Sequence, residues 1–116
     1  MTNLSPGLSL ATSTSAAETT LSVTGEIDLE TAPQLRDALM AVVTTAQSQV
    51  LIDLSGVSFM DSTGLHTLMA AKRRADISGV ELAVTHPSHV VERLLEVTGL
   101  TTAFQPQAGS ASPAPA

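Results

Sequence analysis

Cysteine, tryptophan and tyrosine are absent from this chain of 116 residues, and its only aromatic side chains are Phe59 and Phe104. Without cysteine, the chain can form no disulfide, no thiol nucleophile and no cysteine-bound metal site. Hydrophobic residues still make up 43% of the sequence, so a core is possible but must be largely aliphatic. The length is enough for one domain and too short for two.

Basic residues are also scarce, since five Lys and Arg stand against eleven Asp and Glu and give a formal net charge of −6. A surface of this sign repels nucleic acid, so we predict no DNA or RNA partner and favour a protein with a basic contact face. No apolar stretch approaches the roughly 18 residues that cross a bilayer. The N-terminus also lacks the basic and apolar segments of a signal peptide. We therefore expect no membrane association and a cytoplasmic location.

The first half of the chain predicts a hairpin followed by a helix. Residues 8–12 and 20–28 carry apolar side chains at alternating positions, which is typical of half-buried strands. Their closeness in sequence favours antiparallel pairing, and Gly25 indicates a bulge or a close backbone approach. Thr31 and Gln34 then form a T-x-x-Q capping box, so we expect a helix to begin there.

Strands and helices alternate through the second half. VLIDL at residues 50–54 is nearly continuous in apolar residues, as expected of a central strand covered on both faces. The helix after FMDSTGL is expected to end at Gly79, with the basic run 72–74 near its end, where positive charge complements the helix dipole. Residues 80–84 form the next predicted strand, and TAF at 102–104 is a candidate final edge strand.

A third helix is expected to start at Pro87 and to end at Gly99. Its predicted inward side chains are Val90, Val91, Leu94, Leu95 and Val97.

The order β-β-α-β-α-β-α predicts an α/β domain over residues 8–105. Such a domain has a central mixed sheet of about four to five strands, three or more helices and right-handed crossovers. We expect residues 1–7 to be a flexible start and residues 106–116, which are rich in Ala, Pro and Ser, to be a disordered tail.

The stretch FMDSTGL, residues 59–65, carries the main candidate site. It leaves the carboxyl end of the VLIDL strand, where sites of open α/β sheets lie. Hydroxyl groups at a helix N-terminus either cap the helix or carry a phosphate that the helix dipole stabilises. Gly64 in the first helical turn costs about 1 kcal/mol against alanine, which suggests that another group approaches the backbone closely. A capped helix with an incidental glycine explains the local pattern equally well.

Three longer segments make the interpretation more specific. GEIDLETAPQLRDAL, VLIDLSGVSFMDSTGLHTLMAAKRRA and HPSHVVERLLEVTGL resemble the anti-sigma factor antagonists, which are single STAS domains. The resemblance runs from about Leu8 to Phe104. It implies a STAS-like fold and a protein that is not an enzyme and needs no cofactor.

The resemblance also implies roles for particular residues. The serine that is phosphorylated in this family falls on Ser62, and the acidic residue of the G-E-x-D motif falls on Asp28. Asp61, Thr63 and Gly64 complete the expected partner-binding loop. Family members often read D-S-S-G-L-G, whereas this chain has Thr63 and His66 at the two differing positions. We expect His66 to face outward and to influence the choice of partner.

The implied mechanism is partner switching. Unphosphorylated, the chain binds an anti-sigma factor that is also a serine kinase, and the sigma factor is released. Phosphorylation of Ser62 adds about −1.5 to −2 charges beside Asp61 and weakens that complex, and a phosphatase resets the switch. The rival interpretation within the family is a STAS module that is not switched and acts in trans in a transport, lipid-handling or stress-sensing complex.

Two catalytic alternatives are weaker. A serine hydrolase would pair Ser62 with one of the three histidines, but the chain has no G-x-S-x-G motif. A metal site from His86, His89 and Glu92 has suggestive spacing but no obvious fourth ligand. Asp53 is expected to hydrogen-bond near the candidate site rather than to act as a base.

Overall fold

The computed structural model describes residues 7–16, 18–46 and 48–106. These residues form one four-stranded sheet, three α-helices and a short 3₁₀ helix. The strands are β1 (Leu8–Ser15), β2 (Glu18–Ile27), β3 (Gln49–Met60) and β4 (Glu81–Thr85), and the helices are α1 (Ala32–Thr45), α2 (Ser62–Ser78), α3 (His89–Val97) and η1 (Thr102–Phe104). The predicted order β-β-α-β-α-β-α is therefore confirmed.

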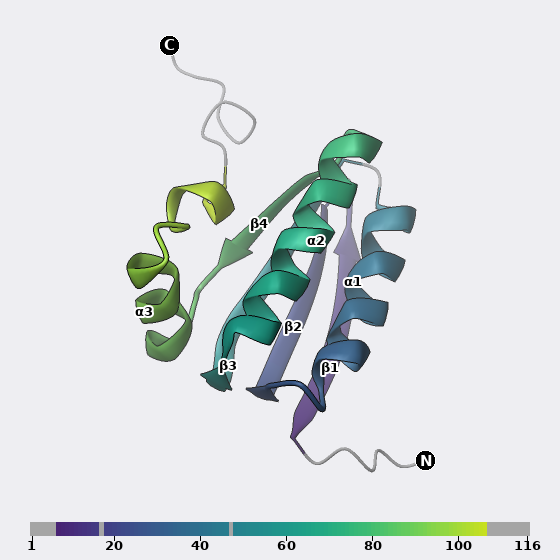
Figure 1. Cartoon of the computed structure of the whole chain (residues 1–116). Coiled ribbons are helices and arrows are strands. Elements are labelled where there is room, and N and C mark those ends of the chain that lie inside the picture. Colours follow the sequence, from purple (N-terminus) through teal and green to yellow (C-terminus); the bar gives the residue numbers. More distant parts are fainter. Residues whose placement is uncertain (1–6, 17, 47, 107–116) are drawn as a thin grey trace.

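The strands lie in the sheet in the order β1-β2-β3-β4. The predicted hairpin is confirmed, since β1 pairs antiparallel with β2, whereas β2, β3 and β4 run parallel. The sheet is thus mixed. The carboxyl ends of β2 and β3 lie together at one end of the molecule, beside the start of α2 (Figure 1).

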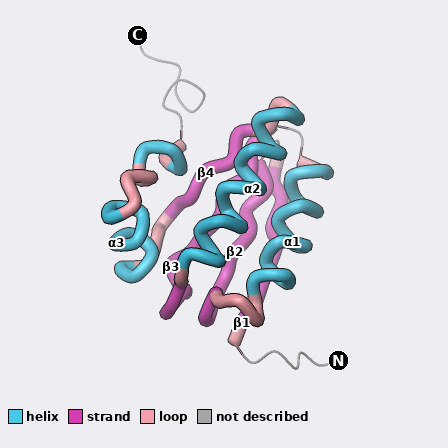
Figure 2. Tube along the Cα trace, in the orientation of Figure 1, coloured by secondary structure: helices cyan, strands magenta, loops and turns pink. Residues whose placement is uncertain are grey.

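Helices α1 and α2 lie on one face of the sheet, and α3 and η1 lie at its edge beside β3 and β4 (Figure 2). Because each crossover moves one strand further in the same direction, right-handed connections put α1 and α2 on the same side. The expectation that residues 50–54 are covered on both faces is therefore wrong. Val50, Ile52 and Leu54 are fully buried beneath the helices, whereas Leu51 and Asp53 are only half-buried on the opposite face.

The core between helices and sheet is aliphatic apart from one aromatic side chain, as the composition required. Its fully buried large residues include Leu21, Ile27, Leu35, Leu39, Ile52, Leu54, Leu68 and Phe104. Burying a side chain of this size stabilises the fold by about 1.5–3 kcal/mol relative to leaving it exposed. This packing holds α1 against α2 and β2, and α2 against β3 and β4.

Helix α1 begins where it was predicted, but without the expected capping box. Thr31 is the N-cap residue, yet its side chain makes no capping hydrogen bond. Its hydroxyl instead donates to the carbonyl of Glu26 at 2.8 Å and accepts from the amide of Asp28 at 3.0 Å. The hydroxyl therefore shapes the loop before the helix, and Gln34 has no capping partner there.

Helix α2 ends at Gly79, as predicted, in the left-handed conformation with φ 74°. The basic run 72–74 does not mark the end of the helix, because α2 continues to Ser78 and its last turn holds no basic residue. Lys72 pairs instead with Asp76 one turn later, at 3.6 Å.

The region after β4 departs most from the predictions. Helix α3 starts at His89, two residues later than predicted, with Ser88 as its cap. Val91 and Leu95 are buried, but Val97 is 71% exposed. At 3.6 residues per turn, Val97 points about 120° away from Val91 and about 160° away from Leu95.

The TAF segment is a 3₁₀ turn and not an edge strand. This turn directs Phe104 into the core, where the side chain is only 1% exposed. The burial of the ring against β4 replaces the strand pairing that was expected.

Gly25 does mark a close backbone approach, as predicted. Its φ of 118° lies outside the range that other residues adopt easily, and a β-carbon there would collide with the carbonyl of Gly7. The register between β2 and β3 also shifts at this point.

The predicted tail falls outside the described residues except for Pro106, and the predicted flexible start does so except for Gly7. Among the described helices, none combines the length and the apolar character that a membrane crossing requires.

Candidate functional site

The candidate site lies where β2 and β3 end side by side (Figure 1). Ile27 and Met60 are the last residues of these parallel strands, and they are register partners. The amide of Asp61 donates to the carbonyl of Ile27 at 3.3 Å, which ties the start of α2 to the loop that follows β2. The topology therefore brings Asp28 and Asp61, which are far apart in the sequence, to the same end of the sheet.

Asp61 caps α2. Its Oδ1 accepts from the amide of Thr63 at 2.9 Å, and its carbonyl accepts from the amides of Gly64 and Leu65. Ser62 follows as the first helical residue and is exposed. Among the described residues, no side-chain hydrogen bond engages the Ser62 hydroxyl. An exposed hydroxyl at a helix N-terminus can take a phosphate, whose charge the helix dipole favours.

Asp28 organises the neighbouring loop. Its Oδ1 accepts from the amides of Glu30 at 2.9 Å and Thr31 at 3.1 Å. Together with the hydroxyl of Thr31, these bonds fix the turn from β2 into α1. One role of Asp28 is thus structural, which the sequence pattern did not predict.

Gly64 is buried, and contacts within the domain explain why a glycine occupies this position. A β-carbon at this position would lie 2.6 Å from Cγ2 of Ile27 and 2.7 Å from Cγ of Met60. Both distances are shorter than van der Waals contact allows. The glycine therefore lets the first turn of α2 pack against the ends of β2 and β3, so the group that approaches its backbone closely belongs to the domain itself.

Gly64→Ala is therefore expected to destabilise the domain, not to stabilise it. Alanine gains about 1 kcal/mol of helix propensity, but overpacking against a stiff isoleucine costs about 1–3 kcal/mol. We expect a net loss of about 1 kcal/mol in the free energy of unfolding, measured by urea denaturation. Ser78→Ala, at an exposed position late in α2, is the control and should be neutral or slightly stabilising. A more stable Gly64→Ala variant would show that this contact relaxes.

The cap at Asp61 gives a second prediction. Asp61→Ala removes the acceptor of the Thr63 amide and should lower the stability by about 1 kcal/mol. Asp61→Asn keeps an equally good cap and should remain close to wild type. Thermal unfolding of the two variants separates the hydrogen bond from the charge. Equal losses in both would mean that the charge, and not the cap, provides the stability.

The other predicted residues occupy different positions. Thr63 is half-buried, and His66 is exposed as predicted. Asp53 is not near the site, because it lies eight residues before Asp61 along β3, roughly 26 Å away at about 3.3 Å per residue. The amide of Ser55 donates to Asp53 Oδ1 at 2.9 Å and holds the pKa of that carboxyl below its usual value.

The catalytic alternatives gain no support from the geometry. No hydrogen bond joins Ser62 to a histidine in the part of the chain that the structure describes, and His86 Nδ1 lies 3.0 Å from the hydroxyl of Thr85. Within the same residues, no group of three His, Asp or Glu side chains converges in a way that could hold a metal ion.

Comparison with known proteins identifies the family. A sequence model described as "Mlab, STAS domain" matches residues 10–106. The anti-sigma-B factor antagonist of Staphylococcus aureus is 31% identical over 93 residues, which cover 80% of this chain and 86% of that protein. The chain belongs to the STAS-domain family of anti-sigma factor antagonists.

Solved structures agree with this assignment. An anti-sigma factor antagonist from Mycobacterium paratuberculosis superimposes with a TM-score of 0.77 at 29% identity, over 95% of both chains. The antagonist SpoIIAA in its unphosphorylated form gives a TM-score of 0.70 over 89% of this chain and 92% of its own. At 17% identity, SpoIIAA supports the STAS fold alone. The members of this family are regulatory binding proteins rather than enzymes.

In this STAS domain, sequence reasoning missed two exposed apolar side chains at the end of the sheet that carries the candidate site. Leu29, in the loop after β2, is 75% exposed, and Phe59, next to the end of β3, is 46% exposed. Leu29 stands between Asp28 and Glu30 in the sequence, whereas the exposure of Phe59, two residues after the buried Val57, is seen only in the structure.

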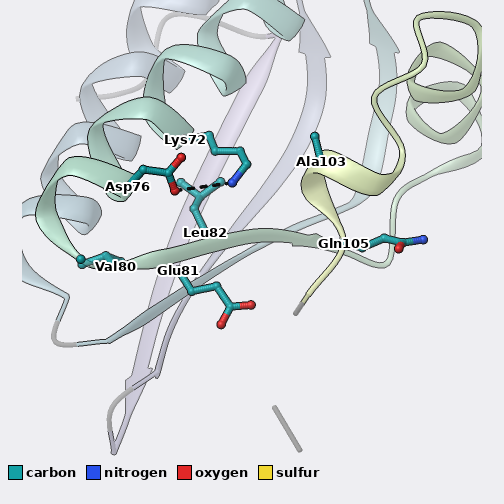
Figure 3. Close-up of a pocket in the computed structure, with 8 residues that line it drawn as sticks. Lys72, Asp76, Val80, Glu81, Leu82, Ala103 and Gln105 are labelled. Carbon is teal, nitrogen blue, oxygen red and sulfur yellow. Dashed lines mark ion pairs between the residues drawn. The ribbon is translucent and has the colours of Figure 1, made fainter. Parts of the chain in front are cut away.

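Ser62 lines none of three hollows in the part of the STAS domain that the structure describes. One, of about 320 Å³, opens between α2, β4 and η1 at the far end of α2 (Figure 3). The Lys72–Asp76 ion pair, Glu81 and Gln105 line it together with small and apolar side chains. None of the predicted site residues lines this hollow.

Proposed function

We propose that this STAS domain releases a sigma factor by binding its anti-sigma factor, and that phosphorylation of Ser62 ends this binding. The exposed, unengaged hydroxyl of Ser62 at the first position of α2 is the observation that carries the proposal. The partner-binding residues are Asp28, Asp61, Ser62, Thr63, Gly64 and His66, with Gly64 acting through the packing of the helix start. The proposed location is the cytoplasm.

In this proposal the partner is a serine kinase, and the kinase reaction explains why phosphate on Ser62 weakens the complex. Phosphoryl transfer requires the Ser62 oxygen to approach the terminal phosphate of the nucleotide in line. After transfer, the new phosphate faces the nucleotide's remaining phosphates and lies beside Asp61. Two unpaired like charges in a desolvated interface are costly. A phosphatase then restores the free hydroxyl.

The free phosphoprotein needs no change of fold. A phosphate on Ser62 would lie at the N-terminus of the 17-residue helix α2, where the dipole stabilises negative charge. The internal bonds of Asp28 and Asp61 hold both loops before and after modification.

The second candidate function is a STAS interaction module that is not switched and acts in trans. The description of the matching family model, which does not name an anti-sigma factor antagonist, favours it. The two functions differ in whether Ser62 is a substrate.

Affinity purification from the native cell, followed by mass spectrometry, tests the proposal. We expect an anti-sigma factor among the captured proteins. When it is purified and mixed with this chain and ATP, the intact mass of this chain should increase by one phosphate. Capture of a transport or lipid-handling assembly, with no change in mass after ATP, would favour the second function.

A further inference from the structure

Large hydrophobic side chains are exposed at a few places in the described residues, and two of them lie at the end of the sheet from which α2 begins. The exposed set is Leu29 at 75%, Phe59 at 46%, Ile77 at 81%, Val90 at 37% and Val97 at 71%. Leu29 lies two residues beyond the end of β2. Phe59 is the register partner of Glu26 on the neighbouring strand. The ends of β2 and β3 are joined by the bond from Asp61 to Ile27, so both side chains belong to one end of the sheet.

The charge around these two side chains has a single sign. Residues 26–31 and 58–63 together hold four carboxylates and no Lys or Arg. Asp28 and Asp61 use their carboxylates to hold the loops, whereas Glu26 and Glu30 are exposed and form no ion pair within the described residues. The basic run 72–74 lies further along α2, beyond its second turn.

We propose that Leu29 and Phe59 are the apolar anchors by which this domain docks on its anti-sigma factor, with Glu26 and Glu30 as an acidic rim. This inference rests on the proposed function and extends it to the kind of surface that the partner presents. The occupant is a protein face with an apolar recess bordered by Lys or Arg, because that face complements both the exposed hydrophobic area and the charge. Paired apolar anchors within a polar rim are typical of protein interfaces.

In this proposal, Leu29 and Phe59 contribute to docking and not to phosphoryl transfer. Burial of Leu29 and Phe59 supplies affinity that does not depend on the Ser62 hydroxyl, and the acidic rim accelerates association. Loss of an anchor should therefore raise the KM for phosphorylation of Ser62 in proportion to Kd and leave kcat unchanged.

The test measures the affinity of the purified anti-sigma factor for wild type, Leu29→Ala and Phe59→Ala. Ile77→Ala and Val97→Ala are matched controls, because they remove equally exposed apolar groups elsewhere on the molecule. We expect each anchor variant to weaken binding by about tenfold or more and each control by less than about twofold. Leu29 lies in an exposed loop, so Leu29→Ala should keep the wild-type melting temperature and remain informative even if Phe59→Ala unfolds.

The outcomes distinguish the docking surface from the function. Equal affinities for the anchor variants, the controls and wild type would overturn the docking surface, while tight wild-type binding would still support the proposed function. A lower kcat for Leu29→Ala at unchanged KM would also overturn it, because the side chain would then act on transfer and not on docking. Failure of wild type to bind the anti-sigma factor at all would overturn both.

Discussion

Phosphorylation of Ser62 is expected to weaken binding to the anti-sigma factor by at least about a hundredfold. An unpaired charge buried in an interface costs about 3–5 kcal/mol, and about 2.7 kcal/mol already corresponds to a hundredfold change in Kd. Ser62→Ala should bind like wild type and resist switching. Ser62→Asp carries one charge and fewer acceptors than phosphate, so its effect should be intermediate. Isothermal titration calorimetry on the four proteins measures this series.

Ser78→Asp is the matched control for charge. It adds the same carboxylate at an exposed position on the same helix, but at the opposite end from the candidate site. The control should bind within about twofold of wild type, since exposed charges more than a Debye length apart are largely screened. Equal affinities of wild type, Ser62→Ala and the genuine phosphoprotein would contradict the switching mechanism.

Phe104→Ala is expected to be the most destabilising single substitution proposed here. The ring is 1% exposed and is the only aromatic side chain in the described core, and truncation of a buried phenylalanine costs about 3–5 kcal/mol. The free energy of unfolding of a small domain is only about 5–15 kcal/mol in total, so the variant should melt at a much lower temperature than wild type. Phe59→Ala provides the control, because that ring is 46% exposed and its loss should cost much less. Similar melting temperatures for the two variants would show that η1 is not part of the core.

The periodic parts of the sequence predicted the fold well. Alternation in residues 20–28 located β2, because one buried face leaves a regular pattern in the order of residues. Gly79 and Gly99 likewise marked helix ends, since both adopt positive φ. The segment 102–104 was mistaken for a strand, because three residues are too few to show a period.

Features that depend on contacts across the sheet could not be predicted. The glycine at position 64 is required by Ile27 and Met60, and that contact exists only once β2 and β3 pair in register. Thr31 matched a capping box locally, but its hydroxyl accepts from the amide of Asp28 and not from an amide of the helix. The uncovered second face of the sheet follows from the strand order, which local patterns do not contain.

The candidate site also contains features that local sequence patterns predicted and features that they did not. The start of a helix at Asp61 and Ser62 was predicted, because FMDSTGL directly follows an apolar strand. Phosphorylation of Ser62 stays a prediction. Leu29 was missed, since an isolated leucine in a polar loop looks incidental until its exposure and its place at this end of the sheet are known.

A release assay tests the central claim most directly. The anti-sigma factor is loaded with its sigma factor, and free sigma factor is measured after adding this STAS domain in its unphosphorylated or its Ser62-phosphorylated form. The proposed function predicts release by the unphosphorylated protein and by Ser62→Ala, with little or none by the phosphorylated form. Equal release by the two forms, or no release by either, would contradict it.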